Sequence, residues 1–311
     1  MKQANVFSTF LDYRVELMGL ATIWIALMHF FVDPLPTLHI PVLTPILARG
    51  NLGVEMFLLL SGMGLYYSLK KDRNARHFYQ RRIKRVVIPW LLLSLPYWIA
   101  ATAIGISSTV SGDAHAFSPG LFLLNWSGLS FWLRGTTTVW YVSFILLMYL
   151  LYPAIFDIQT SAQGARKILA LIALDVVCNI VVAVAFPGLY DSLEIALTRV
   201  PCFLAGSLIG ETVFHRQRPS LSLKVLLMIS GLLFLSCYPV YTLDKRVSVM
   251  LYRYGGAGVM ALFMLLLCAL FEKADLPHLR KILRFFGKIS LEFYLVSVFL
   301  RNLVVYLLTA S

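Results

Sequence analysis

One histidine in an apolar stretch is the side chain best suited to acid–base chemistry. His29 lies near the end of segment 16–31, which is otherwise mostly apolar. An ionisable group in such a setting is costly unless it has a partner or a use. Arg14 lies about 60° from His29 around a helix and about four turns away, so both can face one groove. Alternatively, His29 hydrogen-bonds a neighbouring helix and Arg14 is an ordinary basic flank.

A carboxylate and several small residues mark the next apolar segment. Glu55 is followed by Ser61, Gly62 and Gly64. Small residues at this spacing let helices approach closely, whereas a carboxylate within a membrane usually has a specific partner. We predict His29 as that partner, because the two residues are expected at similar depth and a carboxylate raises the basicity of an imidazole.

A basic stretch precedes the third apolar segment. Residues 81–85 read Arg-Arg-Ile-Lys-Arg, shortly before Pro89. Arg82 and Arg85 are three residues apart and share a helical face, which predicts two guanidinium groups able to grip one phosphate-rich ligand. Alternatively, the stretch only fixes the orientation of the chain in the membrane.

The composition places these residues in a membrane protein. The chain has 311 residues, of which 59% are hydrophobic and 14% charged, with a mean hydropathy of +0.79. A soluble domain has a very different balance. The four cysteines lie alone in separate apolar runs, so we expect core residues and no metal site. Basic flanks of membrane spans explain the net charge of +12 better than nucleic-acid binding does, and they favour membrane lipids and an anionic ligand as partners.

Nine segments are long enough to cross a bilayer, which takes roughly 17–25 apolar residues each. They are predicted at 16–32, 52–69, 86–107, 138–157, 167–187, 193–213, 221–242, 247–271 and 286–309. Segment 117–132 is a candidate tenth span. A crossing there would move every later basic loop to the opposite side, so we expect an interfacial or re-entrant piece instead. The basic loops then share one side, which predicts a cytoplasmic N-terminus and an all-α polytopic membrane protein.

Taken in order, these motifs resemble the acyltransferase 3 family of membrane-bound O-acyltransferases along almost the whole chain. Members move acyl groups from a coenzyme A donor to cell-surface glycans, lipids or peptidoglycan. The matching stretches are 19–29, 53–62, 81–89, Trp140-Tyr141 with Tyr149 and Pro153, 199–206, and 287–295. The resemblance implies a single transmembrane acyltransferase domain over 1–311, with about nine to ten helices around a central acyl-transfer pocket, in a bacterial inner membrane.

The resemblance also implies roles for individual residues. His29 is the general base that takes the proton of the acceptor hydroxyl, and Arg82 and Arg85 hold the phosphates of the donor, acetyl-CoA or another acyl-CoA. To these we add, from the residues themselves, Glu55 as the expected catalytic neighbour of His29, and Arg81 as a further donor-binding cation of the same basic stretch. The acceptor is expected to be a polysaccharide, peptidoglycan or a lipid-linked sugar, and no metal is expected.

Two positions depart from the family pattern. Met18 stands where the family usually has Arg or Lys, eleven residues before the histidine. Either Arg14, one turn earlier on nearly the same face, supplies that charge and joins the donor-binding cations, or the contact is missing. Ser297 stands where the family often has a second histidine, so any role of that histidine is absent or altered.

Two other functions compete with acyl transfer. A transporter or flippase for a sugar or a lipid-linked glycan would use His29, Glu55 and Arg301 to line a pathway, because intramembrane charges often mark such pathways. This alternative leaves the position of the Arg-x-x-Arg pair unexplained. A catalytically degenerate member of the family would only scaffold a glycan-synthesis complex, and Met18 and Ser297 favour that hypothesis.

Overall fold

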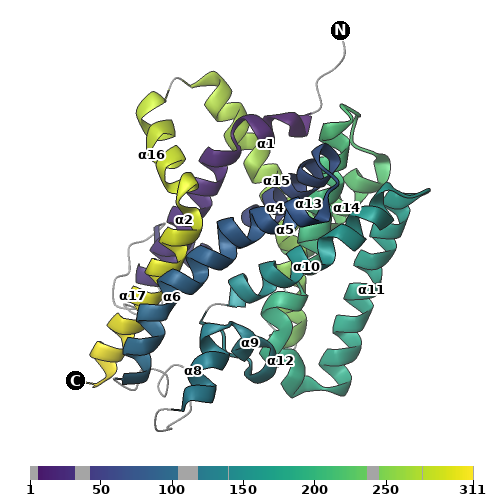
Figure 1. Ribbon diagram of the computed structural model, residues 1–311. Coiled ribbons are helices and arrows are strands. Elements are labelled where there is room, and N and C mark those ends of the chain that lie inside the picture. Colours follow the sequence, from purple (N-terminus) through teal and green to yellow (C-terminus); the bar gives the residue numbers. More distant parts are fainter. Residues whose placement is uncertain are drawn as a thin grey trace.

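The computed structural model describes residues 6–31, 43–103, 118–138, 140–236, 245–274 and 276–310, in which every regular element is a helix (Figure 1). Eight helical stretches are long and apolar enough to span a membrane. They are α2 (Arg14–Phe31), α4 (Leu52–Lys71), α5 through α6 (Ala75–Ala103), α10 (Trp140–Thr160), α11 (Gly164–Ala185), α12 through α13 (Pro187–Phe214), α15 (Lys245–Lys273) and α17 (Ser290–Ala310). The predicted all-α polytopic fold is confirmed.

The ninth predicted span and the candidate tenth span correspond to shorter helices. Where a span was predicted at 221–242, α14 (Leu221–Ser236) is an apolar helix of 16 residues, and 237–244 lie outside the described residues. The candidate tenth span forms two helices, α8 (Pro119–Trp126) and α9 (Leu129–Arg134), separated by Gly128 at φ +79°. Helices of eight and six residues are too short to cross a bilayer. The other short helices are η1 (Val6–Ser8), α1 (Thr9–Asp12), α3 (Leu43–Ala48) and α16 (Pro277–Lys288).

Helix α4 lies at the centre of the bundle. In its most apolar 18-residue window, 78% of the residues are buried, against 17% for α11, whose large apolar side chains face outward. Helix α4 packs against α2, α10, α13 and α15. Against α13 the two backbones touch, because Gly62 faces the Phe203 carbonyl and Gly206 faces Leu59, and a Cβ on either glycine would collide with the opposite backbone.

Several basic loops meet at one end of the bundle. The end of α4, the turn between α10 and α11, and the end of α13 share one cavity, which brings Lys70, Arg166 and His215 together. Helices α1 and α16 lie at one end of the molecule, and the end of α17 lies at the other (Figure 1). This arrangement agrees with alternating crossings in which the basic loops share a side.

Candidate functional site

A cavity of about 500 Å³ opens among α2, α4, α10, α17 and the junction of α5 with α6. Four cations line it, Arg14, Arg82, Arg85 and Lys288. Three tyrosines, Tyr141, Tyr149 and Tyr294, and two serines also line it, and no carboxylate does among the described residues. We call this cavity the basic pocket. Its inner part is apolar, with Val54, Phe57 and Ile25 in its wall.

Arg82 and Arg85 reach the basic pocket through an irregular turn. Between α5 (Ala75–Arg82) and α6 (Ile88–Ala103) the chain forms the π-helical turn η2 (Ile83–Val87). Pro89 has no N–H to donate to the carbonyl of Arg85, and its ring crowds that carbonyl, so a regular α-helical turn is disfavoured here. Such π turns are frequent at functional sites. The predicted convergence of the two arginines is therefore found, although a regular helical face does not produce it.

Side chains hold the guanidinium group of Arg82, and a main-chain carbonyl holds that of Arg85. Arg82 donates from Nη2 to the Ser68 hydroxyl at 3.1 Å, and its Cζ lies 5.3 Å from the Phe78 ring centroid and 5.5 Å from that of Tyr149. Arg85 donates from Nη2 to the carbonyl of Lys288 at 2.9 Å. These contacts satisfy hydrogen-bonding groups without neutralising either charge, so both arginines keep their positive charge for an anionic ligand.

Arg14 joins these cations from the start of α2. Its guanidinium lies over Gly64, where a Cβ would come within 3.1 Å of Nη2. Gly64 therefore makes room for an arginine, which the sequence pattern of small residues did not reveal. Met18 lines the same pocket one turn later. Arg14 and Met18 thus line the same part of the pocket, and Arg14 provides a cation there while Met18 does not.

His29 lies just beyond the inner end of the basic pocket. The pocket wall includes Ile25 but not His29. His29 follows Ile25 by four residues, so it lies about 6 Å further along α2 and about 40° around it. Its side chain is partly buried. The basic pocket therefore leads from the arginines toward His29 along one side of α2.

Glu55 has a different partner from the one that the sequence predicts. It forms a buried ion pair with Arg199, whose Nε donates to Oε1 at 3.0 Å, and the two side chains are 0% and 1% exposed. Arg199 also donates to the Ile195 carbonyl and lies 4.7 Å from the Trp140 ring centroid. Residues so placed hold α4, α10 and α13 together rather than lining the basic pocket.

The depth of Glu55 also differs from the prediction. Helices α2 and α4 are antiparallel, with Gly50 against Trp24 and Met28, and Gly53 against Ala21 and Ile25. This register puts Glu55 about level with Ala21, roughly 12 Å from His29 along the helix axis. The predicted pairing of Glu55 with His29 is therefore replaced by the pairing with Arg199.

Arg81 lies beside the basic pocket without lining it. Its Nη1 donates to the Asp72 carboxylate at 2.8 Å on the exposed surface, and its Nη2 donates to the Ser68 hydroxyl at 3.4 Å, the group that Arg82 also contacts. The Arg81 guanidinium, followed by the N–H of Asn74, lowers the pKa of Asp72 to about 2. Arg81 therefore serves the turn between α4 and α5, although the sequence groups it with Arg82.

The three tyrosines of the basic pocket and Lys288 are not among the site residues that the sequence predicts. Tyr141, Tyr149, Tyr294 and Lys288 all line the basic pocket. They fall in the stretches that carry the family resemblance, so the signal for them was their position in those motifs. Tyrosines supply apolar walls together with a polar group, which suits a pocket for a ligand with a charged end and an apolar arm.

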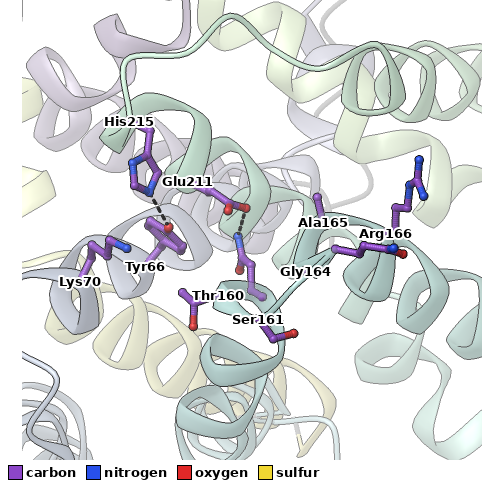
Figure 2. A pocket seen from close by; sticks show the side chains of 11 residues that line it. Tyr66, Lys70, Thr160, Ser161, Gly164, Ala165, Arg166, Glu211 and His215 are labelled. Atoms are coloured by element: carbon purple, nitrogen blue, oxygen red, sulfur yellow. Dashed lines mark hydrogen bonds between the residues drawn. The ribbon is translucent and has the colours of Figure 1, made fainter.

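A second cavity, of about 450 Å³, has a different chemistry (Figure 2). Its Glu211 accepts from Gln159 Nε2 at 2.9 Å, and its His215 lies 3.2 Å from the Tyr66 hydroxyl. Figure 2 shows the Tyr66–His215 pair and Glu211, and Lys70 and Arg166 are among the other side chains that line the cavity. Because its acidic, amide and imidazole groups pair with one another, this cavity is less suited than the basic pocket to hold a polyanion.

Comparison with known proteins identifies the family. A family model described as an acyltransferase domain matches residues 17–311, which is nearly the whole chain. No curated protein and no solved structure matches the chain. Among the described residues, no group of three or more His, Cys, Asp or Glu side chains is placed to hold a metal ion.

Proposed function

This chain belongs to the acyltransferase 3 family, and we propose that it moves an acyl group, acetyl in the first instance, from acyl-CoA to an acceptor hydroxyl. The acceptor class is a cell-surface polysaccharide, peptidoglycan or a lipid-linked sugar. The observation that carries the proposal is the basic pocket, in which four cations and, among the described residues, no carboxylate converge beside an apolar interior. Coenzyme A carries phosphates at one end and a long uncharged pantetheine arm at the other, which matches these two halves.

The basic pocket supports a direct transfer. Arg14, Arg82 and Arg85 would bind the donor phosphates, and the pantetheine arm would run past Tyr149 toward Ile25. His29 would remove the proton from the acceptor hydroxyl, and that oxygen would attack the thioester carbonyl. The carbon–sulfur bond would then break, and the leaving thiolate would take the proton from the imidazolium. An imidazole suits this proton transfer because its ordinary pKa is near neutrality.

The proposed membrane orientation follows from the same charges. We place the protein in a bacterial inner membrane, with the N-terminus and the basic loops in the cytoplasm, because basic loops remain on that side. Acyl-CoA is a cytoplasmic metabolite, so the basic pocket would open where the donor is found. His29, further along α2, would lie nearer the side where surface glycans are completed.

The test compares two histidine variants of the purified protein. His29→Ala is expected to lower acetyl transfer, or acetyl-CoA hydrolysis, by about 10²- to 10⁴-fold, because it removes a general base. Its affinity for acetyl-CoA, measured by calorimetry, should stay the same. His77→Ala is the matched control, since His77 contacts Asp72 on the exposed surface. Full activity of the His29 variant would refute the mechanism.

Two competing functions give different results in these assays. The transport hypothesis needs Glu55 to line a pathway, but Glu55 is buried in its pair with Arg199, so the geometry favours acyl transfer. A transporter would show no CoA binding and no acetyl transfer. A catalytically degenerate scaffold would bind CoA, and the wild-type protein would show no turnover with any acceptor.

A further inference from the structure

A second cation-lined cavity lies beside the basic pocket, on α16. It has a volume of about 460 Å³ and is lined by Pro277, Arg280, Lys281, Arg284, Phe285 and Lys288. Four of these six residues are cations, and none is acidic. Lys288 lines both this cavity and the basic pocket, so the two cavities are neighbours. We call it the α16 cavity.

The position of α16 is fixed by close packing against α2. Gly19 faces the Leu283 carbonyl, and Gly287 faces the Val15 carbonyl. A side chain on either glycine would separate the two helices. Figure 1 shows α16 beside the start of α2, the turn that also carries Arg14. Helix α16 therefore holds its cations at a constant distance from the basic pocket.

A buried carboxylate orients two of the α16 cations. Glu16 is 1% exposed, and its Oε1 accepts from Arg284 Nε at 2.8 Å and from Arg280 at 3.3 Å. One carboxylate between two arginines leaves a net positive charge. Lys281 and Lys288 have no acidic partner among the described residues. The α16 cavity is therefore a preorganised cationic site, in which Glu16 fixes the geometry without cancelling the charge.

We propose that the α16 cavity binds the 3′-phosphate and the adenosine of the acyl-CoA donor. This inference rests on the proposed function. Coenzyme A carries two separate phosphate groups, a diphosphate that joins the pantetheine arm to the ribose and a monoester at the ribose 3′ position. The basic pocket takes the diphosphate and the arm, while Lys281 and its neighbours take the 3′-phosphate. The exposed ring of Phe285 offers the adenine a surface for stacking.

Binding of the 3′-phosphate in a cavity of its own makes the affinity for the donor depend on that phosphate. A donor without the 3′-phosphate would leave the α16 cavity unused and lose its charge-assisted contacts, which are the strong class of hydrogen bond. The protein should therefore select acyl-CoA over acyl-dephospho-CoA. A lipid phosphate on α16 would produce no such selection, because it would favour both donors equally.

The test measures the affinity of the full-length protein in phosphatidylcholine nanodiscs for acetyl-CoA and for acetyl-dephospho-CoA, by calorimetry. We expect the wild-type protein to bind acetyl-CoA about 10-fold or more tightly, since hydrogen bonds to charged groups are the stronger ones. Lys281→Gln should weaken acetyl-CoA binding by a similar factor and leave acetyl-dephospho-CoA unaffected. Lys281 is the diagnostic position, because it lines the α16 cavity and not the basic pocket.

Lys224→Gln, on the exposed surface of α14, is the matched control and should change neither affinity. Equal binding of the two donors by the wild-type protein would overturn the inference and leave acyl-CoA dependence intact. An equal loss for both donors in Lys281→Gln would also overturn it. If neither donor binds, the proposed function itself fails.

Discussion

Two groups of arginines lie within the membrane-spanning region, and their surroundings differ. Arg199 is paired with Glu55, packed on Trp140 and 1% exposed. Arg14 and Arg82 line a cavity of about 500 Å³, in whose wall the described part of the chain places no carboxylate. A buried charge needs a counter-charge to be tolerated, whereas cations kept together around a cavity repel one another and are poised for an anion. The first group serves the fold, and we propose that the second serves binding of the donor.

Breaking the ion pair should have the largest effect. Glu55→Gln leaves the buried guanidinium of Arg199 without its counter-charge, so we expect a loss of about 3–5 kcal/mol in the free energy of unfolding. Thermal unfolding in detergent, with the monodisperse fraction measured by size exclusion, would show it. The double variant Glu55→Leu/Arg199→Leu should recover much of this loss. A Glu55→Gln protein as stable as the wild type would remove the distinction between the two groups.

Changing the basic pocket should affect binding instead of stability. Arg82→Gln is expected to weaken acetyl-CoA binding by about 10- to 100-fold, because a charge-assisted contact is lost. Its melting temperature without ligand should be equal to that of the wild type or higher, since repulsion among the cations falls. Saturating CoA should raise the melting temperature of the wild type more than that of the variant. An Arg82→Gln protein that unfolds as readily as Glu55→Gln would contradict this assignment.

The smallest effect is expected at Arg81, which lies next to Arg82 in the chain. Arg81→Gln should lower acetyl-CoA affinity far less than Arg82→Gln does, because Arg81 contacts Asp72 and Ser68 without lining the basic pocket. A calorimetric titration beside that of Arg82→Gln makes the comparison direct. Equal losses in the two variants would show that the whole basic stretch acts as one binding unit.

The same contact predicts a pH dependence. The pKa of Asp72 is lowered from 3.8 to about 2 in the folded protein. A lowered pKa means that the ionised carboxylate stabilises the fold above about pH 4, and that this contribution is lost as the pH falls toward 2. The difference in melting temperature between wild type and Asp72→Asn should therefore be small at pH 5, and should shrink as the pH falls from 4 toward 2.

The sequence could predict the spans but not all of their partners. Runs of apolar residues fix the position of a membrane helix because the bilayer sets its length, and eight of the predicted spans are present. The convergence of Arg82 with Arg85 was predictable from their spacing. The partner of Glu55 was not, because Arg199 is 144 positions away and no local pattern selects it among the other intramembrane charges.

Local geometry explains other differences. Arg81 and Arg82 both donate to the Ser68 hydroxyl, but Arg81 also pairs with Asp72 on the surface, whereas Arg82 lines the basic pocket. The role of Gly64 depends on the long side chain of Arg14 from another helix. Small residues in a sequence predict a close contact with another part of the chain. Only the three-dimensional structure shows whether the contacting group is a backbone, as at Gly62, or a guanidinium, as at Gly64.

The π-helical turn at Ile83–Val87 joins α5 to α6 and sets the rotation of one helix relative to the other. Upstream of it, Arg82 faces Tyr149, and downstream Trp90 donates to the Trp126 carbonyl at 3.1 Å and joins α6 to α8. Deleting one residue inside the turn would rotate Arg82 by about 100° relative to α6 and leave the residues of α6 (Ile88–Ala103) unchanged. The turn thus sets the direction of Arg82 relative to α6, while the contact of Trp90 with α8 stays the same.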